Sequence, residues 1–181
     1  MGYVKWSYDT LNTFCHDVFR KFGFNEEETN IIKDVLLTAD LYGIESHGMQ
    51  RMVRYDKGIE KGTIHPDAEP EVVFETPVSA VIDGHDGMGQ LISHLQMEKA
   101  IEKAKETGVG FVSVRKLQSF RYCRILCGNG FKTGLTWYGM YQLGSNHGTY
   151  LWTKSNAWFQ SHCSGNACRT LSIPFLTAPQ Q

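Results

Sequence analysis

No apolar run in this 181-residue sequence is long enough to span a membrane, and its first residues show no signal-peptide pattern. A net charge of −1 gives no indication of nucleic-acid binding. Cys163 and Cys168 have the spacing C-x-x-x-x-C, which matches no common zinc pattern. We therefore expect a soluble cytoplasmic protein with no metal site, no nucleic-acid partner and no membrane association.

Acidic residues are absent from the last third of the chain. All 19 Asp and Glu precede residue 116, and residues 116–181 contain none, although the same density would have placed about 11 there. Lys and Arg number 12 before this point and 6 after it, so the net charge changes from −7 to +6. The change predicts two parts of different origin, residues 1–115 and residues 116–181.

Hydrophobic periodicity before the break predicts a mixed α/β fold, with helices first and then a strand–helix–strand unit. Asn25 is the predicted N-cap of the second helix. From Lys116 onward no sustained period of either kind is present, so the C-terminal third is expected to be irregular. Helices are predicted at residues 8–22, 25–39, 46–61 and 91–106, and strands at 72–74, 79–82 and 109–114.

Chemistry-bearing side chains gather in residues 39–55, A-D-L-Y-G-I-E-S-H-G-M-Q-R-M-V-R-Y. Ser46 is predicted to cap a helix on which His47, Arg51 and Tyr55 share one face. The open N–H groups of a helix start, together with a guanidinium, suit a carboxylate, and a histidine beside it could move a proton at a neighbouring oxygen. This geometry favours a small 2-oxo or 2-hydroxy acid, although on spacing alone ordinary surface residues are the better explanation.

The same segment resembles the signature of the malate/L-lactate dehydrogenase family, roughly A-D-x-x-G-x-x-S-H-G-x-x-R-x-x-x-Y. The resemblance continues through Gly62, Asp83-Gly84, Gly87-x-Gly89-Gln90 and residues 112–115, and it stops after residue 115. The signature is long and specific, so it outweighs the argument from spacing. Its matching residues are Ala39, Asp40, Gly43, Ser46, His47, Gly48, Arg51 and Tyr55.

The resemblance implies an oxidoreductase without a Rossmann domain that transfers a hydride between NAD or NADP and a small 2-hydroxy or 2-oxo acid. By the same resemblance His47 is a catalytic residue, Arg51 grips the substrate carboxylate and Ser46 lines the site. The intact protein would be a homodimer. Its cofactor-binding residues would lie mainly downstream of residue 115 and are unknown in this chain.

A change of reading frame at Lys116 accounts for the tail. Residues 116–127, K-L-Q-S-F-R-Y-C-R-I-L-C, can be encoded so that the next frame reads N-S-N-H-F-G-I-A-G-Y-Y. That string resembles the family sequence expected after this strand, and one extra A in the Lys116 codon would produce the shift. The S-N-H-G string at residues 145–148 is then an accident of the wrong frame.

The frame change would remove the family's second active-site histidine, which would be encoded across Ser119 and Phe120. The chain is therefore expected to fold poorly and to have no dehydrogenase activity. The alternative is a non-enzymatic helical interaction module with a flexible aromatic tail, which limited proteolysis would distinguish because a folded module resists cleavage after residue 115.

Overall fold

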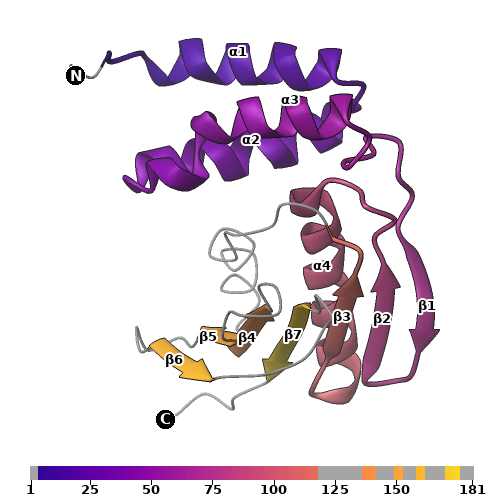
Figure 1. The fold of residues 1–181 in the computed structure, drawn as a ribbon. Coiled ribbons are helices and arrows are strands. Elements are labelled where there is room, and N and C mark those ends of the chain that lie inside the picture. Colours follow the sequence, from indigo (N-terminus) through magenta and orange to yellow (C-terminus); the bar gives the residue numbers. More distant parts are fainter. Residues whose placement is uncertain (1–3, 118–135, 142–148, 153–157, 162–169, 176–181) are drawn as a thin grey trace. The chain divides into compact units, whose positions relative to one another are not determined.

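A computed structural model describes residues 4–117, 136–141, 149–152, 158–161 and 170–175. The chain divides into two compact units, Met1–Asp67 and Ala68–Gln181, and each is described by itself. The first unit is helical, and the second contains one helix and a β-sheet (Figure 1). The mixed α/β class predicted from the sequence is confirmed.

Helices build the first unit, and the predicted start of the second helix is confirmed. Asn25 accepts a hydrogen bond from the Glu28 N–H at 2.9 Å, and the Glu28 carboxylate accepts one from the Asn25 N–H at 2.8 Å. This reciprocal pair satisfies two donors that the first turn of a helix otherwise leaves open. The elements are α1 (Tyr8–Lys21), α2 (Glu26–Leu41), the short 3₁₀ helices η1 (Glu45–His47) and η2 (Met49–Arg51), and α3 (Met52–Glu60).

Aromatic rings hold these helices together. The ring of Phe19, fully buried on α1, lies with its centroid 5.8 Å from that of Phe22, 6.1 Å from that of Phe24 and 6.4 Å from that of Tyr55. Edge and tilted arrangements of this kind are favoured over parallel stacking by the charge distribution of the rings. Tyr55 is therefore part of the core that joins α3 to α1.

A second contact attaches the segment before α3 to α1. Cys15 is fully buried, and its thiol meets the thioethers of Met49 and Met52. Burial raises the pKa of the Cys15 thiol to about 12. The thiol is therefore protonated at neutral pH and packs as a small apolar group against the side chain of Met49.

The second unit is built on a seven-stranded sheet in the order β1-β2-β3-β7-β4-β5-β6. Strands β2 and β3 are parallel, and α4 (Gly89–Thr107) connects them and packs on them, as the predicted strand–helix–strand unit requires. The core of this unit consists of Ala80, Ile82, Ile92, Ala100, Val112 and Val114. The first three strands are β1 (Glu71–Glu75), β2 (Ser79–Asp83) and β3 (Phe111–Arg115).

Four further strands lie after residue 117: β4 (Thr136–Tyr141), β5 (Thr149–Trp152), β6 (Trp158–Ser161) and β7 (Thr170–Phe175). These strands lie in the C-terminal third, which the sequence predicts to be irregular, so that prediction is wrong for them. Thr, Trp, Tyr and Phe favour strands, and β7 pairs with both β3 and β4, a long-range pairing that local periodicity does not show. Cys163, Cys168 and residues 145–148 lie outside the described residues, and the boundary at residue 116 stays a prediction.

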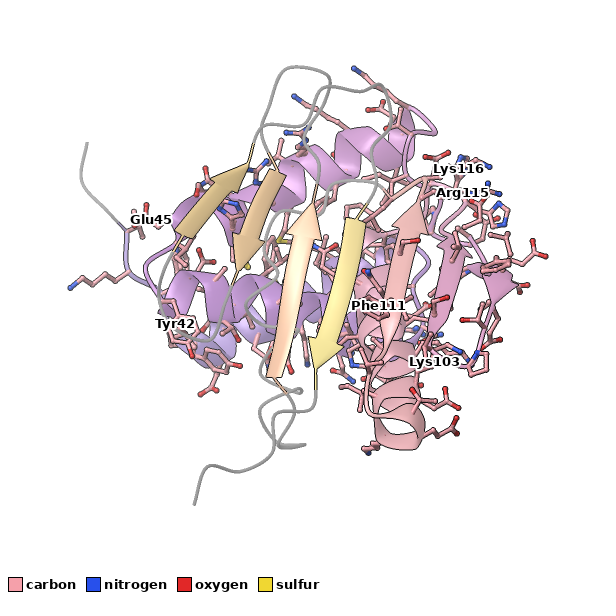
Figure 2. The ribbon with its side chains drawn as sticks, turned by 90° about the horizontal axis from the view of Figure 1, so that it is seen from below. Tyr42, Glu45, Lys103, Phe111, Arg115 and Lys116 are labelled. Carbon is pink, nitrogen blue, oxygen red and sulfur yellow. The ribbon has the colours of Figure 1, made fainter. Side chains whose placement is uncertain are left out.

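A buried carboxylate closes the carboxyl end of the two parallel strands. Asp83, 2% exposed at the end of β2, accepts hydrogen bonds from the His85 N–H at 3.0 Å and Arg115 Nε at 2.9 Å, and Lys116 Nζ lies 3.1 Å away. Arg115 and Lys116 stand next to each other at the end of β3 (Figure 2). The backbone hydrogen bond from His85 and the two cations lower the pKa of Asp83 to about 2.

Replacing Asp83 by Asn is expected to lower the melting temperature at pH 7 by about 3–6 °C, because the variant loses the charge that both cations face. A carboxylate whose pKa is depressed on folding stabilises the fold above its ordinary pKa of 3.8, and this contribution disappears as the pH falls toward 2. Thermal melts from pH 7 to pH 2 should therefore converge for Asp83→Asn and the unmodified chain. Glu106→Gln, at an exposed carboxylate on α4, is the control, and an equal loss of stability in that variant would contradict the account.

Candidate functional site

The candidate site begins at the turn that ends α2. Gly43 has φ 72°, in the left-handed region that glycine enters without strain, and its N–H donates to the Asp40 carbonyl at 2.9 Å. The Ile44 N–H donates to the Ala39 carbonyl at 2.9 Å, so the last carbonyls of the helix are satisfied within the turn. Glu45 lies just after this turn, at the start of η1 (Figure 2).

Two short 3₁₀ helices and α3 replace the single helix predicted at residues 46–61. Ile44 is the N-cap residue of η1 and Gly48 that of η2, and neither provides a side-chain cap, so the prediction that Ser46 is an N-cap is wrong. The N–H groups of His47 and Gly48 donate to the Ile44 and Glu45 carbonyls at 2.9 Å and 3.1 Å. Those backbone donors are already bonded within the turn, which also removes the open helix start predicted for an anion.

Ser46 is nevertheless the residue that brings the two predicted polar side chains together. Its hydroxyl lies 2.8 Å from Nδ1 of His47, and its carbonyl accepts a hydrogen bond from Nε of Arg51 at 2.6 Å. Ser46 is exposed, whereas His47 and Arg51 are half-buried. One residue therefore orients both the imidazole and the guanidinium, although they belong to different short helices.

This arrangement has a definite chemical capacity. When Nδ1 of His47 donates to the Ser46 hydroxyl, Nε2 is the ring nitrogen that can accept a proton, and when the hydroxyl donates, Nε2 carries the proton. Arg51 remains cationic at any physiological pH and carries five N–H donors in a planar fork, of which Nε is directed to Ser46. An imidazole, which can exchange a proton, and a permanent cation are thus both hydrogen-bonded to Ser46.

Asp40 and Gly48 support this turn, and the sequence alone indicated no role for either of them. Oδ2 of Asp40 accepts a hydrogen bond from the Met49 N–H at 2.8 Å. A Cβ at position 48 would overlap the Asp40 carboxylate, although φ of −90° at Gly48 is open to other residues. Burial raises the pKa of Asp40, the Met49 hydrogen bond lowers it, and the charge of Glu45 raises it, with a net upward shift.

Tyr55 lies in the hydrophobic core. It is 3% exposed and lies against Phe19 in the core, whereas the sequence places it on the same helix face as His47 and Arg51. The break at Gly48 changes the rotation of the chain between His47 and Tyr55, so the spacing of an uninterrupted helix does not apply.

In the part of the chain that the structure describes, no group of three His, Cys, Asp or Glu side chains is placed to hold a metal ion. Among the described helices, none has the length and apolar character needed to cross a membrane.

Known proteins resemble this chain in sequence. The chain is 44% identical over 114 residues to a malate dehydrogenase of Pyrococcus abyssi, a match that covers 63% of the chain and 32% of the relative. It is also 44% identical over 104 residues to an L-sulfolactate dehydrogenase of Methanocaldococcus jannaschii, which covers 58% of the chain and 30% of that protein. The chain therefore spans about a third of the length of these curated relatives.

A solved structure shares this fold, and a family model matches most of the sequence. The malate dehydrogenase of Pyrococcus horikoshii superposes with a TM-score of 0.77 at 28% identity, covering 90% of this chain and 53% of that one. The family model described as malate/L-lactate dehydrogenase matches residues 6–142, well over half of the sequence and including all of the turn around Ser46. The chain belongs to the malate/L-lactate dehydrogenase family.

Proposed function

We propose that the complete protein is an NAD- or NADP-dependent dehydrogenase of a small 2-hydroxy acid, and that the turn around Ser46 supplies the substrate side of its active site. The observation that carries this proposal is the double role of Ser46, which holds His47 through its hydroxyl and Arg51 through its carbonyl. A 2-hydroxy acid presents a carboxylate and a hydroxyl on adjacent carbons, and these two groups suit a guanidinium and an imidazole that are both hydrogen-bonded to one residue, Ser46.

Each residue has a separate task in this proposal. Arg51 binds the substrate carboxylate and so orients C2 and its oxygen. His47 accepts the hydroxyl proton as the alcohol is oxidised and returns it when the 2-oxo acid is reduced. Ser46 lines the site and keeps the imidazole of His47 in one orientation, while the bound nicotinamide supplies or accepts the hydride at C2.

Relatives support this substrate class. Their names include malate dehydrogenase, L-sulfolactate dehydrogenase and ureidoglycolate dehydrogenase (NAD(+)). Malate and sulfolactate each carry a hydroxyl next to a carboxylate, which is the pair of groups assigned to His47 and Arg51. Family membership also favours the enzyme over the helical interaction module.

The cofactor is assigned by resemblance, and no described residue is assigned to it. The turn at residues 83–89 is rich in glycine but lacks the G-x-G-x-x-G pattern of a dinucleotide fold. We infer that the cofactor-binding residues are encoded downstream of residue 115 in the other frame. We further propose that the complete protein is a cytoplasmic homodimer.

DNA sequencing across the codons for Arg115 and Lys116 tests the frame change. We expect an A-run at this point and codons that read N-S-N-H-F-G in the next frame. Codons that cannot encode that string would contradict our account of the tail and would leave residues 116–181 to be explained as this protein's own sequence.

Dehydrogenase activity is tested with the protein made from a gene in which that one base is removed. NADH and NADPH oxidation should be followed with oxaloacetate, pyruvate and sulfopyruvate, each against a blank without enzyme. We expect turnover of at least one of these acids. A folded protein that binds the dinucleotide but reduces none of them would contradict the proposed function.

A further inference from the structure

The turn between α2 and α3 is organised by a side chain that the proposed chemistry does not use. Asp40 lies in the last turn of α2 and is half-buried. Its Oδ2 accepts a hydrogen bond from the Met49 N–H at 2.8 Å. A side chain of α2 therefore satisfies the first backbone N–H of η2. Residues 45–47 lie between the two ends of this hydrogen bond in the sequence, so the bond attaches the chain to α2 directly after them.

Gly48 makes room for this carboxylate. The first three atoms that a Cβ on Gly48 would meet all belong to the Asp40 carboxyl group, at distances that no real Cβ tolerates. With φ of −90°, Gly48 lies outside the left-handed region in which backbone strain would itself favour glycine. The glycine is therefore required by the position of Asp40, and the two residues form one structural unit.

This unit decides where His47 and Arg51 lie relative to Ser46. Gly48 has ψ −147°, far from helical values, and it separates η1, which ends at His47, from η2, which ends at Arg51. If the Met49 N–H lost its acceptor, a continuous helix from residue 46 would offer it the carbonyl of Glu45 instead. The carbonyl of Ser46 would then turn into the helix and would no longer meet Nε of Arg51 in the present geometry.

We propose that Asp40 is a positioning residue that, together with Gly48, holds Ser46, His47 and Arg51 in the geometry that binds a 2-hydroxy acid. This inference rests on the proposed function for its purpose, but its structural content can be tested without substrate. Asp40 itself touches no reacting atom. Its oxygen matters as a hydrogen-bond acceptor, and the upward shift of its pKa indicates that the negative charge itself costs stability at this place.

Three variants of the 181-residue chain, with a fourth as a control, separate an acceptor role from simple stabilisation. Asp40→Asn keeps an oxygen acceptor in the same place, whereas Asp40→Ala removes it. Val35→Ala, at a buried residue five positions before Asp40 on the same helix, destabilises the core and leaves the Asp40 carboxylate in place. Asp34→Ala, at an exposed acid of α2, is the control for loss of an acidic side chain.

The measurements are the hydrogen-exchange protection of the Met49 amide and the ¹⁵N resonances of the His47 ring, which report the bond between Nδ1 and Ser46. We expect Asp40→Ala to lose at least about 10-fold of the Met49 protection and to shift the His47 nitrogens toward those of an unbonded imidazole. Asp40→Asn should restore both readouts. Val35→Ala should lower the melting temperature and leave the His47 nitrogens unchanged.

A Gly48→Ala variant tests the same unit from the other side. Its methyl group displaces the carboxylate, so it should resemble Asp40→Ala in both readouts. In the double variant Asp40→Ala/Gly48→Ala the methyl group has room, and the two losses of stability should be clearly less than additive. Additive losses would overturn the proposed unit, and if Asp40→Ala fails to fold, unchanged readouts in Gly48→Ala would overturn it as well.

Other outcomes would also overturn the inference. These are an unprotected Met49 amide in the unmodified chain, unchanged His47 nitrogens in Asp40→Ala, failure of Asp40→Asn to restore them, or an equal change in Val35→Ala. Failure of the proposed function would look different, because L-malate would then leave His47 and Arg51 undisturbed while the ligand-free readouts still followed the expected pattern.

Discussion

The 181-residue chain is expected to oxidise NADH with oxaloacetate or pyruvate no faster than a blank without enzyme. The proposed site has a substrate side at Ser46, His47 and Arg51, but under the proposed frame change the second proton-transferring histidine and the cofactor-binding residues would be encoded in the other frame. Positioning of a cofactor against the substrate supplies a large part of enzymatic rate enhancement, so its loss removes the activity entirely.

The matched control for this expectation is the protein made after removal of one base at the Lys116 codon. It has the same first 115 residues, so any difference in rate arises from the region that follows them. Turnover by the 181-residue chain itself would contradict the prediction. It would show that residues 116–181 contribute functional structure, for which the strands β4 to β7 would be the starting point.

Replacing Arg51 by Lys in that restored protein is expected to raise KM for its 2-oxo acid by about 100-fold. Lysine keeps the charge but cannot copy the planar fork that binds a carboxylate through two parallel hydrogen bonds. It also loses the present bond from Nε of Arg51 to the Ser46 carbonyl, so its ammonium has no fixed orientation. Steady-state kinetics over a wide substrate range separates KM from kcat.

Arg54→Lys is the control for this substitution, because Arg54 is an exposed arginine on the neighbouring turn of α3. It should leave KM within about two-fold, since exposed charges contribute little to a specific contact. An unchanged KM in Arg51→Lys would remove Arg51 from the substrate site. Equal effects in both variants would indicate general attraction of an anion instead of a defined carboxylate contact.

Local patterns were sufficient for most elements before residue 116. The predicted N-cap at Asn25 depends on residues three positions apart, and it is confirmed. Strand–helix–strand periodicity also predicted β2, α4 and β3 with small differences at their ends. The antiparallel pairing of β7 with β3 joins residues more than 50 positions apart, and no local pattern contains that information.

The site was predicted in part. Ser46, His47 and Arg51 form one hydrogen-bonded group, as their common segment suggested, but the helix that was expected to align them is interrupted. The cause is the contact between Asp40 and the Met49 N–H, nine positions along the chain. Helical spacing describes neighbours three or four positions apart, so it could not indicate that a carboxylate of the preceding helix binds the Met49 N–H and interrupts the expected helix.

The most direct test of the central claim is a titration of the isotope-labelled 181-residue chain with L-malate and, separately, with succinate, followed by NMR at the His47 ring and at Nε–H of Arg51. Succinate has the two carboxylates of malate but no hydroxyl. The account predicts saturable shifts at both residues with L-malate, and at Arg51 but not His47 with succinate. No shift at either residue with L-malate, or shifts confined to other parts of the chain, would contradict the assignment of this turn as the binding site of a 2-hydroxy acid.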